Sequence, residues 1–289
     1  MRTVSYSTKG LKEFSPVGKT WGSNIIHTTD KDLPGLKFRF IVESLRDKFG
    51  LTLEVGCSAG KMLRSLGMVR PDITYFGCDI DDVSVHKGHR ITSDIGFVVG
   101  DGLDLPFRDK TFDAIIINNY LEHVSDARRA MGELERVLKK NGIISGFVPC
   151  QGNMLSPYYI FRLIFGFNFK EPVGGDVQFF TSDDVIHIAR EKKLGIKKVE
   201  YSYHFLGAIF DFVFFLMVYL SHTLADTFWK SNKYYQDGSR AWINVGSRLM
   251  NSALQIGNMI AYLESRMLHN VKASACGIHF VARKYAKDS

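Results

Sequence analysis

The sequence of 289 residues lacks most features that mark exported, repetitive or metal-dependent proteins. Its four cysteines form no C-x-x-C pair and no regular spacing, which argues against a zinc site or a disulfide framework and suits a reducing compartment. The first ten residues, MRTVSYSTKG, lack the apolar core of a secretory signal. No repeat or low-complexity tract interrupts the chain. We therefore expect a folded cytoplasmic protein without a metal site.

Composition and charge indicate a globular chain and give little support for a polyanionic partner. Apolar residues make up 45% and charged residues 23% of the sequence, close to the averages of folded domains. The net charge is +7, but lysines and arginines occur in short scattered groups, such as residues 190–198, where Glu191 interrupts them. Because nucleic-acid binding depends on clustered positive charge, we do not expect a nucleic-acid surface.

The order of apolar runs and helical patterns predicts an elaborated α/β domain. Short apolar runs alternate with stretches of helical periodicity, and glycines or acidic residues separate them. The expected strands are residues 51–56, 74–80, 96–102, 112–119, 142–149, 196–204 and 276–285. Such alternation predicts a parallel sheet with helices on both faces, which is a Rossmann-like, doubly wound architecture.

The same pattern divides the chain into four segments. Residues 1–50 form a polar lead-in that ends in a cap helix, and residues 51–204 form the core. Residues 205–270 form an apolar helical insertion between the last two strands, and residues 271–289 carry the final strand. The insertion must therefore leave the sheet and return to it on one side.

A glycine turn after the first strand is the first candidate for ligand binding. In LEVGCSAG the strand ends at Glu54, and Gly56 and Gly60 flank the turn into the next helix. Glycines allow close backbone approach to a ligand, and a helix N-terminus presents free N–H groups. Asp79 and Asp101 follow at the ends of the next two strands, where a carboxylate can accept hydrogen bonds from a ribose. A ligand with adenine and ribose would reach all three places.

Residues 51–149 resemble the core of class I S-adenosylmethionine-dependent methyltransferases, of the group that methylates quinones, sterols and other small molecules. The resemblance rests on LEVGCSAG, GCDI, VGDGLDLPF, FDAIIINNYLEHV and ERVLKKNGII, in the family's order and spacing. It implies that the chain binds S-adenosylmethionine and transfers its methyl group. One departure is Ser58, which stands where the family often has a middle glycine, so the loop is expected to be tighter.

The resemblance also implies roles for single positions. The implied cofactor contacts are Glu54, Gly56, Cys57, Ser58 and Gly60 in the methionine loop, Asp79 and Ile80 at the ribose, Asp101 and Gly102 at the adenine, and Asn119 beside the sulfonium. A nicotinamide dinucleotide is the rival ligand for a similar fold. Its pyrophosphate favours G-x-G-x-x-G without a nearby acid, whereas Glu54 suits a cationic amino-acid ligand.

The catalytic candidates follow the fourth strand. His123, in YLEHV, is a candidate base that removes a proton from a hydroxyl or enol as the methyl arrives, because histidine is the side chain that most often does so. Glu122 and Tyr120 are alternatives, and a histidine that only packs at a helix start is the other interpretation. Enzymes that methylate adenine N6 or glutamine N5 resemble one another in an Asn/Asp-Pro-Pro-Tyr motif. The corresponding stretch here, NNYL, lacks the two prolines. Oxygen or carbon is therefore favoured over nitrogen as the acceptor atom.

The tripeptide PCQ at Cys150 raises a different mechanism. It resembles the site where DNA cytosine-5 methyltransferases carry their nucleophilic cysteine. Here, however, it follows the fifth strand instead of the fourth, and the look-alike EHV precedes it. A lone cysteine without a cationic neighbour is usually a small buried side chain, so we expect Cys150 to line the substrate pocket instead of attacking.

The insertion begins with the most apolar stretch of the chain. Within residues 204–229, the segment 205–225 is long enough to span a bilayer, but Asp211 at mid-depth would cost roughly 2.5–3.5 kcal/mol. Residues 240–268 offer an amphipathic partner helix. Three interpretations compete: a helical subdomain, a membrane-surface element beside the substrate pocket, and a dimer interface. His204, Asp211 and His222 share one helix face, but their wide spacing does not predict a metal site.

These observations together predict an S-adenosylmethionine-dependent methyltransferase that acts on a small-molecule, lipid or lipid-linked acceptor. We expect it in the cytoplasm, with peripheral association at the inner face of the membrane. One alternative is an enzyme that methylates RNA or protein. Another is a membrane-associated binding protein that keeps the fold without turnover. The sequence predicts neither the acceptor's identity nor an oligomeric state.

Overall fold

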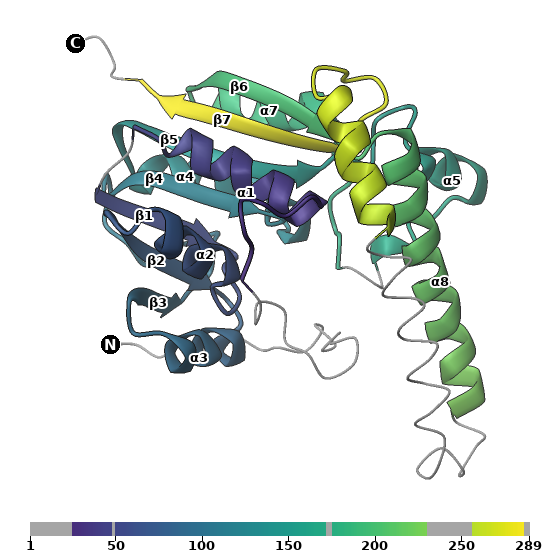
Figure 1. Ribbon diagram of the computed structural model, residues 1–289, viewed down its shortest axis with the longest axis horizontal. Helices are drawn as coiled ribbons and strands as arrows, with labels where there is room; N and C mark the ends of the chain where they lie inside the picture. The colour runs from purple at the N-terminus through teal and green to yellow at the C-terminus, as the bar shows by residue number, and fades with distance from the viewer. Residues whose placement is uncertain (1–24, 48–49, 172–174, 230–255, 286–289) are drawn as a thin grey trace.

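A seven-stranded sheet runs through the computed structural model, which describes residues 25–47, 50–171, 175–229 and 256–285 (Figure 1). The strands are β1 (Gly50–Val55), β2 (Ile73–Asp79), β3 (Ile95–Val99), β4 (Phe112–Asn118), β5 (Leu138–Pro149), β6 (Leu194–Ser202) and β7 (Gly277–Lys284). Their order is β3-β2-β1-β4-β5-β7-β6. The order of the strands reverses between β1 and β4, and α/β proteins bind ligands outside the carboxyl ends of the strands at such a point.

The prediction of a wholly parallel sheet is wrong for the last strand. The pairs from β3 through β5 are parallel, but β7 pairs antiparallel with both β5 and β6. The reason lies in the insertion. Since the chain leaves β6 and returns to β7 at the same edge of the sheet, β7 must run opposite to β6. Residues 205–229 and 256–267 of the insertion are helical, and residues 230–255 lie outside the described part of the chain.

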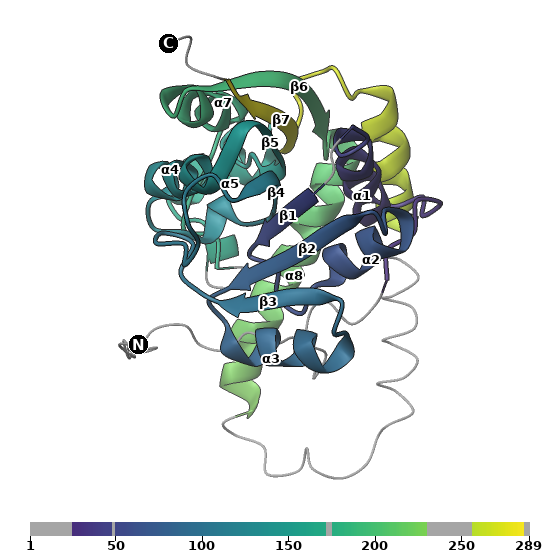
Figure 2. The same ribbon diagram turned by 90° about the vertical axis from the view of Figure 1, so that its left-hand side faces the viewer.

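Helices cover both faces of the sheet, as expected for a doubly wound fold (Figure 2). The labelled helices of the described chain are α1 (Leu33–Ser44), α2 (Lys61–Val69), α3 (Asp82–Ile91), η2 (Leu121–His123), α4 (Ala127–Val137), α5 (Pro157–Phe165), α7 (Ser182–Glu191) and α8 (Phe205–Trp229). Apolar side chains of α1, α2 and α3 form one buried cluster with one face of the sheet. Those of α4 and α7 form a second cluster with the opposite face. The sheet is therefore buried between two helical layers.

Local sequence explains where several helices begin. Asp32 caps α1 through a hydrogen bond from the Gly35 N–H to its carboxylate, with Pro34 in the first turn. Thr181 and Asp184 form a reciprocal capping box at the start of α7. The Asn141-Gly142 pair has the form of a helix stop signal, but α4 ends before it. The helix ends at Val137, and β5 begins directly, with a register shift against β4 near its start.

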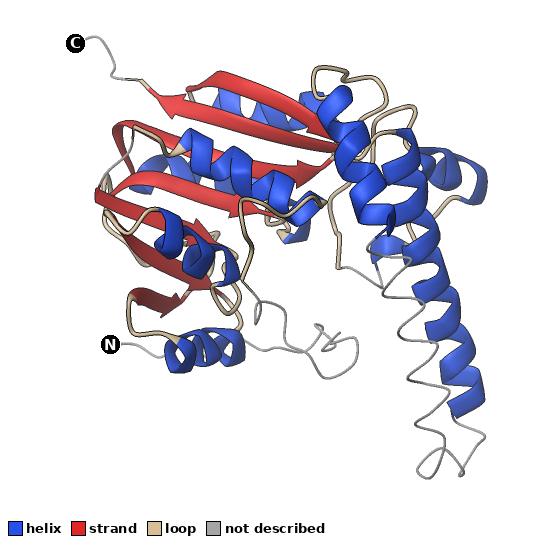
Figure 3. Ribbon diagram, viewed as in Figure 1, coloured by secondary structure: helices blue, strands red, loops and turns tan. Residues whose placement is uncertain are grey.

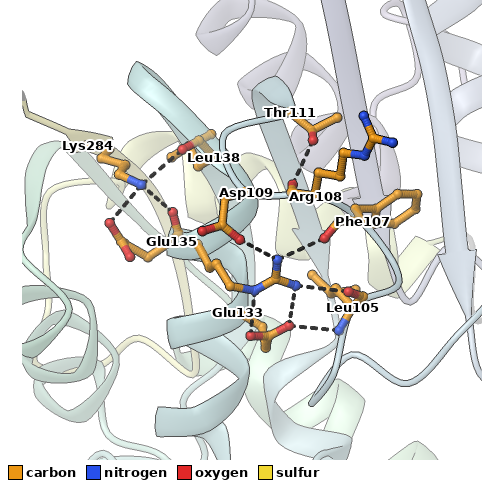
Figure 4. A network of polar contacts seen from close by, with 10 residues as sticks. Leu105, Phe107, Arg108, Asp109, Thr111, Glu133, Glu135, Leu138 and Lys284 are labelled. Atoms are coloured by element: carbon orange, nitrogen blue, oxygen red, sulfur yellow. Dashed lines mark hydrogen bonds and ion pairs between the residues drawn. The ribbon is translucent and has the colours of Figure 1, made fainter.

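One arginine fastens the loop after β3 to α4 (Figure 4). Arg136 donates hydrogen bonds to the backbone oxygens of Leu105 and Phe107, at 2.9 and 2.8 Å. Its guanidinium also contacts the carboxylates of Glu133, at 2.7 Å, and Asp109, at 2.8 Å. Because this loop follows Asp101, the arginine holds the third strand's carboxyl end in place.

A group of helices lies beyond the carboxyl ends of the strands (Figure 3). It consists of α5, α8 and the helical residues 256–267. The N-terminus of α8 rests on residues 256–267, because Leu206 and Gly207 donate backbone hydrogen bonds of 2.9 and 2.8 Å to the Glu264 carboxylate. Within the described residues, no helix combines the length and the apolar character that a membrane crossing requires.

Candidate active site

The turn from β1 to α2 is built from left-handed backbone. Gly56, Ser58 and Gly60 have φ angles of 74°, 48° and 73°. Two of these positions carry glycine, which adopts such angles readily, but Ser58 bears a side chain at a cost of roughly 1–2 kcal/mol. The loop also rests on β2, since the N–H groups of Gly56 and Cys57 donate to the Cys78 carbonyl. This backbone is therefore held in one tight conformation beside the end of the sheet.

Asp79 connects that loop to the end of β2. Its carboxylate accepts hydrogen bonds from the Ser58 N–H at 2.7 Å and from the Asp81 N–H at 3.0 Å, one on each oxygen. Burial raises the pKa of Asp79, and these two N–H groups oppose that shift. A carboxylate has about four acceptor positions, so two remain for further hydrogen bonds. The geometry suits the two hydroxyls of a ribose.

Glu54 is the clearest sign that this edge binds a ligand. Its side chain is buried, and within the described residues its Oε2 atom has no hydrogen-bond partner. Burial, with a smaller contribution from Asp79, raises the pKa of Glu54 well above its usual value. A buried carboxylate oxygen without a partner is unfavourable unless a bound group satisfies it. The ammonium of S-adenosylmethionine is such a group, so the residues present fit the cofactor that the sequence implies.

The residues expected at the adenine lie around the end of β3. Gly102 lies against the Tyr120 side chain, and a Cβ atom there would collide with the phenol oxygen. Asp101 accepts a hydrogen bond of 2.8 Å from the Leu103 N–H. The Ile80 side chain is exposed next to Asp79 and offers an apolar surface for a flat ring. Cys57 is instead buried under the loop, so only its backbone is available to a ligand.

Asn119 brings an unexpected partner to the end of β4. Its φ angle is 55°, and its Oδ1 atom accepts a hydrogen bond of 2.7 Å from Lys37 Nζ. The lysine comes from α1, and its Nζ lies 3.6 Å from the centre of the Phe147 ring. Burial lowers the pKa of Lys37 to about 7, although the negative charge of Glu122 acts in the opposite direction. Helix α1 therefore supplies a polar group to the site as well as apolar packing.

Glu122 and His123 differ sharply in exposure. The Glu122 side chain is 1% exposed, and within the described residues neither of its oxygens has a hydrogen-bond partner. Burial raises the pKa of Glu122 to about 7, while His123 lowers it and Asp176 raises it further. His123 is 40% exposed, and its Nε2 atom lies 3.8 Å from Glu122 Oε1. The histidine predicted as the base thus lies between a buried carboxyl and solvent.

Next to this pair lies a group of side chains that the sequence analysis did not place in the site. We call it the buried charge network, and its members are Gln151, Tyr158, Lys170, Asp176 and Asp211. Gln151 donates a hydrogen bond of 2.5 Å to Asp176. Lys170 Nζ lies 3.3 Å from Asp211 and 4.0 Å from Asp176, and the Tyr158 hydroxyl donates to Asp211 at 2.6 Å. The network joins α8 to the residues beside Glu122.

One signal in the sequence pointed to this network. Asp211 is a lone acid in a very apolar helix, and a charge there needs a buried partner. The helix face that Asp211 shares with His204 does not form a metal site, because His204 Nδ1 instead lies 3.0 Å from Ser274 Oγ. The side chain of His222 lies outside the described residues. Among the residues that the structure describes, no cluster of His, Cys, Asp or Glu could hold a metal ion.

Cys150 lies in the core between the sheet and α7. It is fully buried, its Sγ atom lies 3.6 Å from the Val148 carbonyl, and burial raises the pKa of its thiol. A thiol with a raised pKa is a poor nucleophile. The expectation that Cys150 lines the substrate pocket needs correction, since its neighbour Gln151 is the residue that reaches the buried charge network.

Comparisons with known proteins identify the domain at the core of the chain. Residues 53–145 match a family model described as a methyltransferase domain. A demethylmenaquinone methyltransferase of Thermotoga maritima is 33% identical over 90 residues, which are 31% of this chain and 39% of that protein. The chain spans less than half the length of the first curated relatives that it matches.

Two solved structures share the fold over most of the chain. Phosphoethanolamine N-methyltransferase 2 of Haemonchus contortus, bound to S-adenosyl-L-methionine, superposes with a TM-score of 0.52 at 15% identity, covering 87% of this chain and 52% of that one. A geranyl diphosphate methyltransferase in complex with GPP and sinefungin gives 0.52 at 12% identity, covering 87% and 79%. At these identities the likeness concerns the fold alone.

Proposed function

Because the chain belongs to the class I S-adenosylmethionine-dependent methyltransferases, S-adenosylmethionine is its cofactor, and we propose that it methylates a small apolar or lipid-linked acceptor. The acceptor atom is an oxygen or a carbon. When bound, the cofactor supplies an electrophilic methyl group on its sulfonium. The chain's own part is to hold that group in line with the acceptor and to exclude water.

Four groups of residues are proposed to hold the cofactor. Glu54 accepts hydrogen bonds from the ammonium, and the left-handed loop that ends at Gly60 lets the backbone approach the methionine part. Asp79 accepts from the ribose hydroxyls. The adenine lies against Ile80 and beside Asp101 and Gly102, and Asn119 orients the sulfonium end. The buried Oε2 atom of Glu54 supports this assignment most directly, because it has no hydrogen-bond partner among the described residues and requires a donor.

The exposed apolar surface of the helices beyond the strand ends carries the proposal for the acceptor. On α5, Leu163, Ile164 and Phe165 are 73%, 67% and 60% exposed. Further exposed apolar side chains follow on α8 and on residues 256–267, including Met267. Exposed apolar side chains gathered on a protein's surface mark contact with a membrane or another apolar partner. Here they lie on helices beyond the carboxyl ends of the strands, which supports delivery of a hydrophobic acceptor from a lipid surface.

The name of the curated relatives points in the same direction. They are called demethylmenaquinone methyltransferases, so an aromatic ring with an apolar tail is a reasonable first acceptor to test. The absence of prolines after Asn119 argues against the planar amines that other enzymes of this fold methylate. These points support oxygen or carbon transfer.

Sedimentation with phosphatidylglycerol vesicles tests the lipid part of the proposal. The test variant carries Leu163→Ser, Ile164→Ser and Phe165→Ser. The matched control carries Met68→Ser, Val69→Ser and Ile91→Ser, three exposed apolar side chains at the opposite edge of the sheet. Burial of three such side chains is worth several kcal/mol, so we expect vesicle binding of the test variant to fall roughly a hundredfold.

The control variant should bind vesicles as the wild type does, and all three proteins should bind S-adenosylmethionine equally by calorimetry. If the wild type does not sediment, or if the α5 variant sediments as well as the control, the membrane-derived acceptor is excluded. The search for the acceptor would then move to water-soluble metabolites.

A further inference from the structure

We infer that Glu122, and not the exposed His123, takes the proton from a hydroxyl of the acceptor, and that His123 passes this proton on to solvent. The inference rests on the proposed function, because it requires a methyl donor at the end of β4. It adds the chemical class of the acceptor, an alcohol, phenol or enol, and the route of its proton.

The first observation is the isolation of the Glu122 carboxyl. It is almost completely buried, and none of the described residues donates a hydrogen bond to either oxygen. Its backbone is well held, since the Glu122 carbonyl accepts a hydrogen bond of 3.0 Å from the Gln178 N–H. Side-chain oxygens in a dry site are rarely left without donors. The missing donor is therefore a ligand, and a hydroxyl hydrogen is the group that a carboxylate accepts.

The second observation is the position of Glu122 between the cofactor contacts and the buried charge network. Only two residues separate it in sequence from Asn119, whose side chain accepts a hydrogen bond from Lys37. The charge of Asp176 acts on Glu122 from the network, and Asp176 accepts a hydrogen bond from Gln151, whose Oε1 atom also lacks a partner among the described residues. The unsatisfied atoms here are hydrogen-bond acceptors, which favours a ligand that donates.

The third observation is the orientation of the His123 ring. Nδ1 lies 3.1 Å from the Gly175 carbonyl oxygen, which can only accept a hydrogen bond, so Nδ1 carries the ring's hydrogen. In the neutral ring, Nε2 is then a bare lone pair, and it is this atom that lies 3.8 Å from Glu122 Oε1. The ring is partly exposed to water. It is thus arranged to receive a proton from Glu122 and to release it outside.

The charges around the pair suit a shared proton. Among the described residues, the cations that interact with the Glu122 carboxylate are Lys37 from α1 and Lys170, while Asp176 is the anion that acts on it. Asp176 Oδ1 lies 3.7 Å from His123 Nδ1, where it stabilises a transient positive charge on the ring. Burial brings the pKa of Glu122 to about 7, which is close to the value a general base needs at neutral pH.

The step balances without any further reactant. The acceptor oxygen attacks the methyl carbon, so that an oxygen–carbon bond forms while the carbon–sulfur bond breaks. The electron pair of the broken bond stays on sulfur, and S-adenosylhomocysteine results. The hydroxyl proton passes to the Glu122 carboxylate, which becomes a neutral acid. His123 then takes this proton and releases it to water, and Glu122 is ready for the next turnover.

The test uses the full chain with a prenylated hydroquinone in phosphatidylglycerol vesicles as the acceptor. Release of S-adenosylhomocysteine is measured for the wild type and for Glu122→Gln, Glu122→Asp and His123→Asn. Glu135→Gln, on the outer side of α4, is the control for loss of one carboxylate. Glutamine has the shape of glutamate and removes a buried charge, so Glu122→Gln should fold, and Glu122→Asp is the second variant at the same position.

We expect Glu122→Gln to lower kcat by about 10²–10⁴-fold while the cofactor's Kd changes less than twofold, and Glu122→Asp to recover part of the rate. His123→Asn should lower kcat about tenfold, and imidazole in the buffer should restore most of it. The inference is overturned if Glu122→Gln keeps kcat within threefold of the wild type. It is also overturned if His123→Asn lowers kcat as much as Glu122→Gln does and imidazole does not restore it.

Two outcomes separate this inference from the proposed function. A wild type that binds S-adenosylmethionine but gives no product with the hydroquinone overturns the hydroxyl acceptor, while cofactor binding stands. A wild type that does not bind S-adenosylmethionine at all overturns the proposed function itself.

Discussion

The two sides of the site are built in different ways. On the cofactor side, backbone conformation does most of the work, because the loop between Gly56 and Gly60 is left-handed and two strand ends place Asp79 and Asp101. On the acceptor side, buried charged side chains from distant segments meet one another. The first arrangement is local in sequence, and the second is long-range. One fold can therefore keep its cofactor and change its acceptor, because the two sides depend on different residues.

Loss of Lys170 is the largest test of this comparison. Lys170→Ala leaves Asp176 and Asp211 without their cation in a buried setting, so we expect the free energy of unfolding to fall by about 3–5 kcal/mol. The cofactor's Kd should stay within twofold under conditions where the variant is folded. Urea unfolding and calorimetry measure the two quantities.

The control for this variant is Lys139→Ala. Its ion pair with Asp113 is 2.8 Å long but lies at the surface, so its loss should cost about 1 kcal/mol or less. Equal losses in the two variants would mean that the acceptor side does not depend on buried charge. The comparison between the two sides of the site would then be wrong.

Stability as a function of pH is the second test. The pKa of Glu122 is about 7 in the folded chain, whereas an unperturbed glutamate in the unfolded chain has 4.5. Between these pH values the folded state therefore holds more protons than the unfolded state. The contribution of this carboxyl is present below pH 4.5 and is lost as the pH rises through 7. It amounts to about 3 kcal/mol. Urea unfolding from pH 4.5 to 8 should show this loss in the wild type and not in Glu122→Gln.

Lys37 should act in the opposite direction. Its pKa of about 7 lies below the usual 10.5, so the unfolded state holds more protons between these values and stability rises with pH there. Lys37→Met should therefore abolish the rise in the free energy of unfolding above pH 7. Glu122→Gln should instead abolish the decrease in the free energy of unfolding between pH 4.5 and 7. Identical pH profiles for the two variants would rule out this assignment of buried charges.

The cap of α8 gives the smallest effect. Glu264→Ala removes the carboxylate that accepts from Leu206 and Gly207, and the loss of such a cap costs about 1 kcal/mol. Hydrogen exchange of the first turn of α8 should speed up, while that of the loop around Gly60 should not change. Arg266→Ala, two residues away on the exposed side, is the control. Faster hydrogen exchange in the loop around Gly60 would mean that the acceptor side and the cofactor side are coupled, which would contradict the comparison.

The sequence predicted the core strands and the glycine turn because their signals are local. The glycine turn, the acidic strand ends and the short apolar runs of the core strands are all visible within windows of a few residues. Ser58 was expected to tighten this loop. Its backbone is left-handed, and its N–H donates a hydrogen bond to the Asp79 carboxylate. Even the capping residue of α7 follows from its neighbours.

The acceptor side escaped prediction because each of its residues is ordinary in its own context. Lys37 lies on an amphipathic helix, where a lysine normally faces solvent, and only the packing of α1 across β5 buries it. Lys170 and Asp176 fall in a stretch without periodicity, so no local rule relates them to Asp211. The antiparallel β7 was missed for a similar reason, since its direction depends on the path of the insertion.

A calorimetric titration with S-adenosylmethionine tests the central claim most directly, using the wild type, Asp79→Ala, Asp82→Ala and Glu122→Gln. The ribose bonds of Asp79 are charge-assisted, so its loss should weaken binding by about two to three orders of magnitude. Asp82→Ala, at an exposed neighbouring acid, and Glu122→Gln should stay within about twofold of the wild type. Unchanged binding by Asp79→Ala, or lost binding by Glu122→Gln, would contradict the division of the site into a cofactor side and an acceptor side.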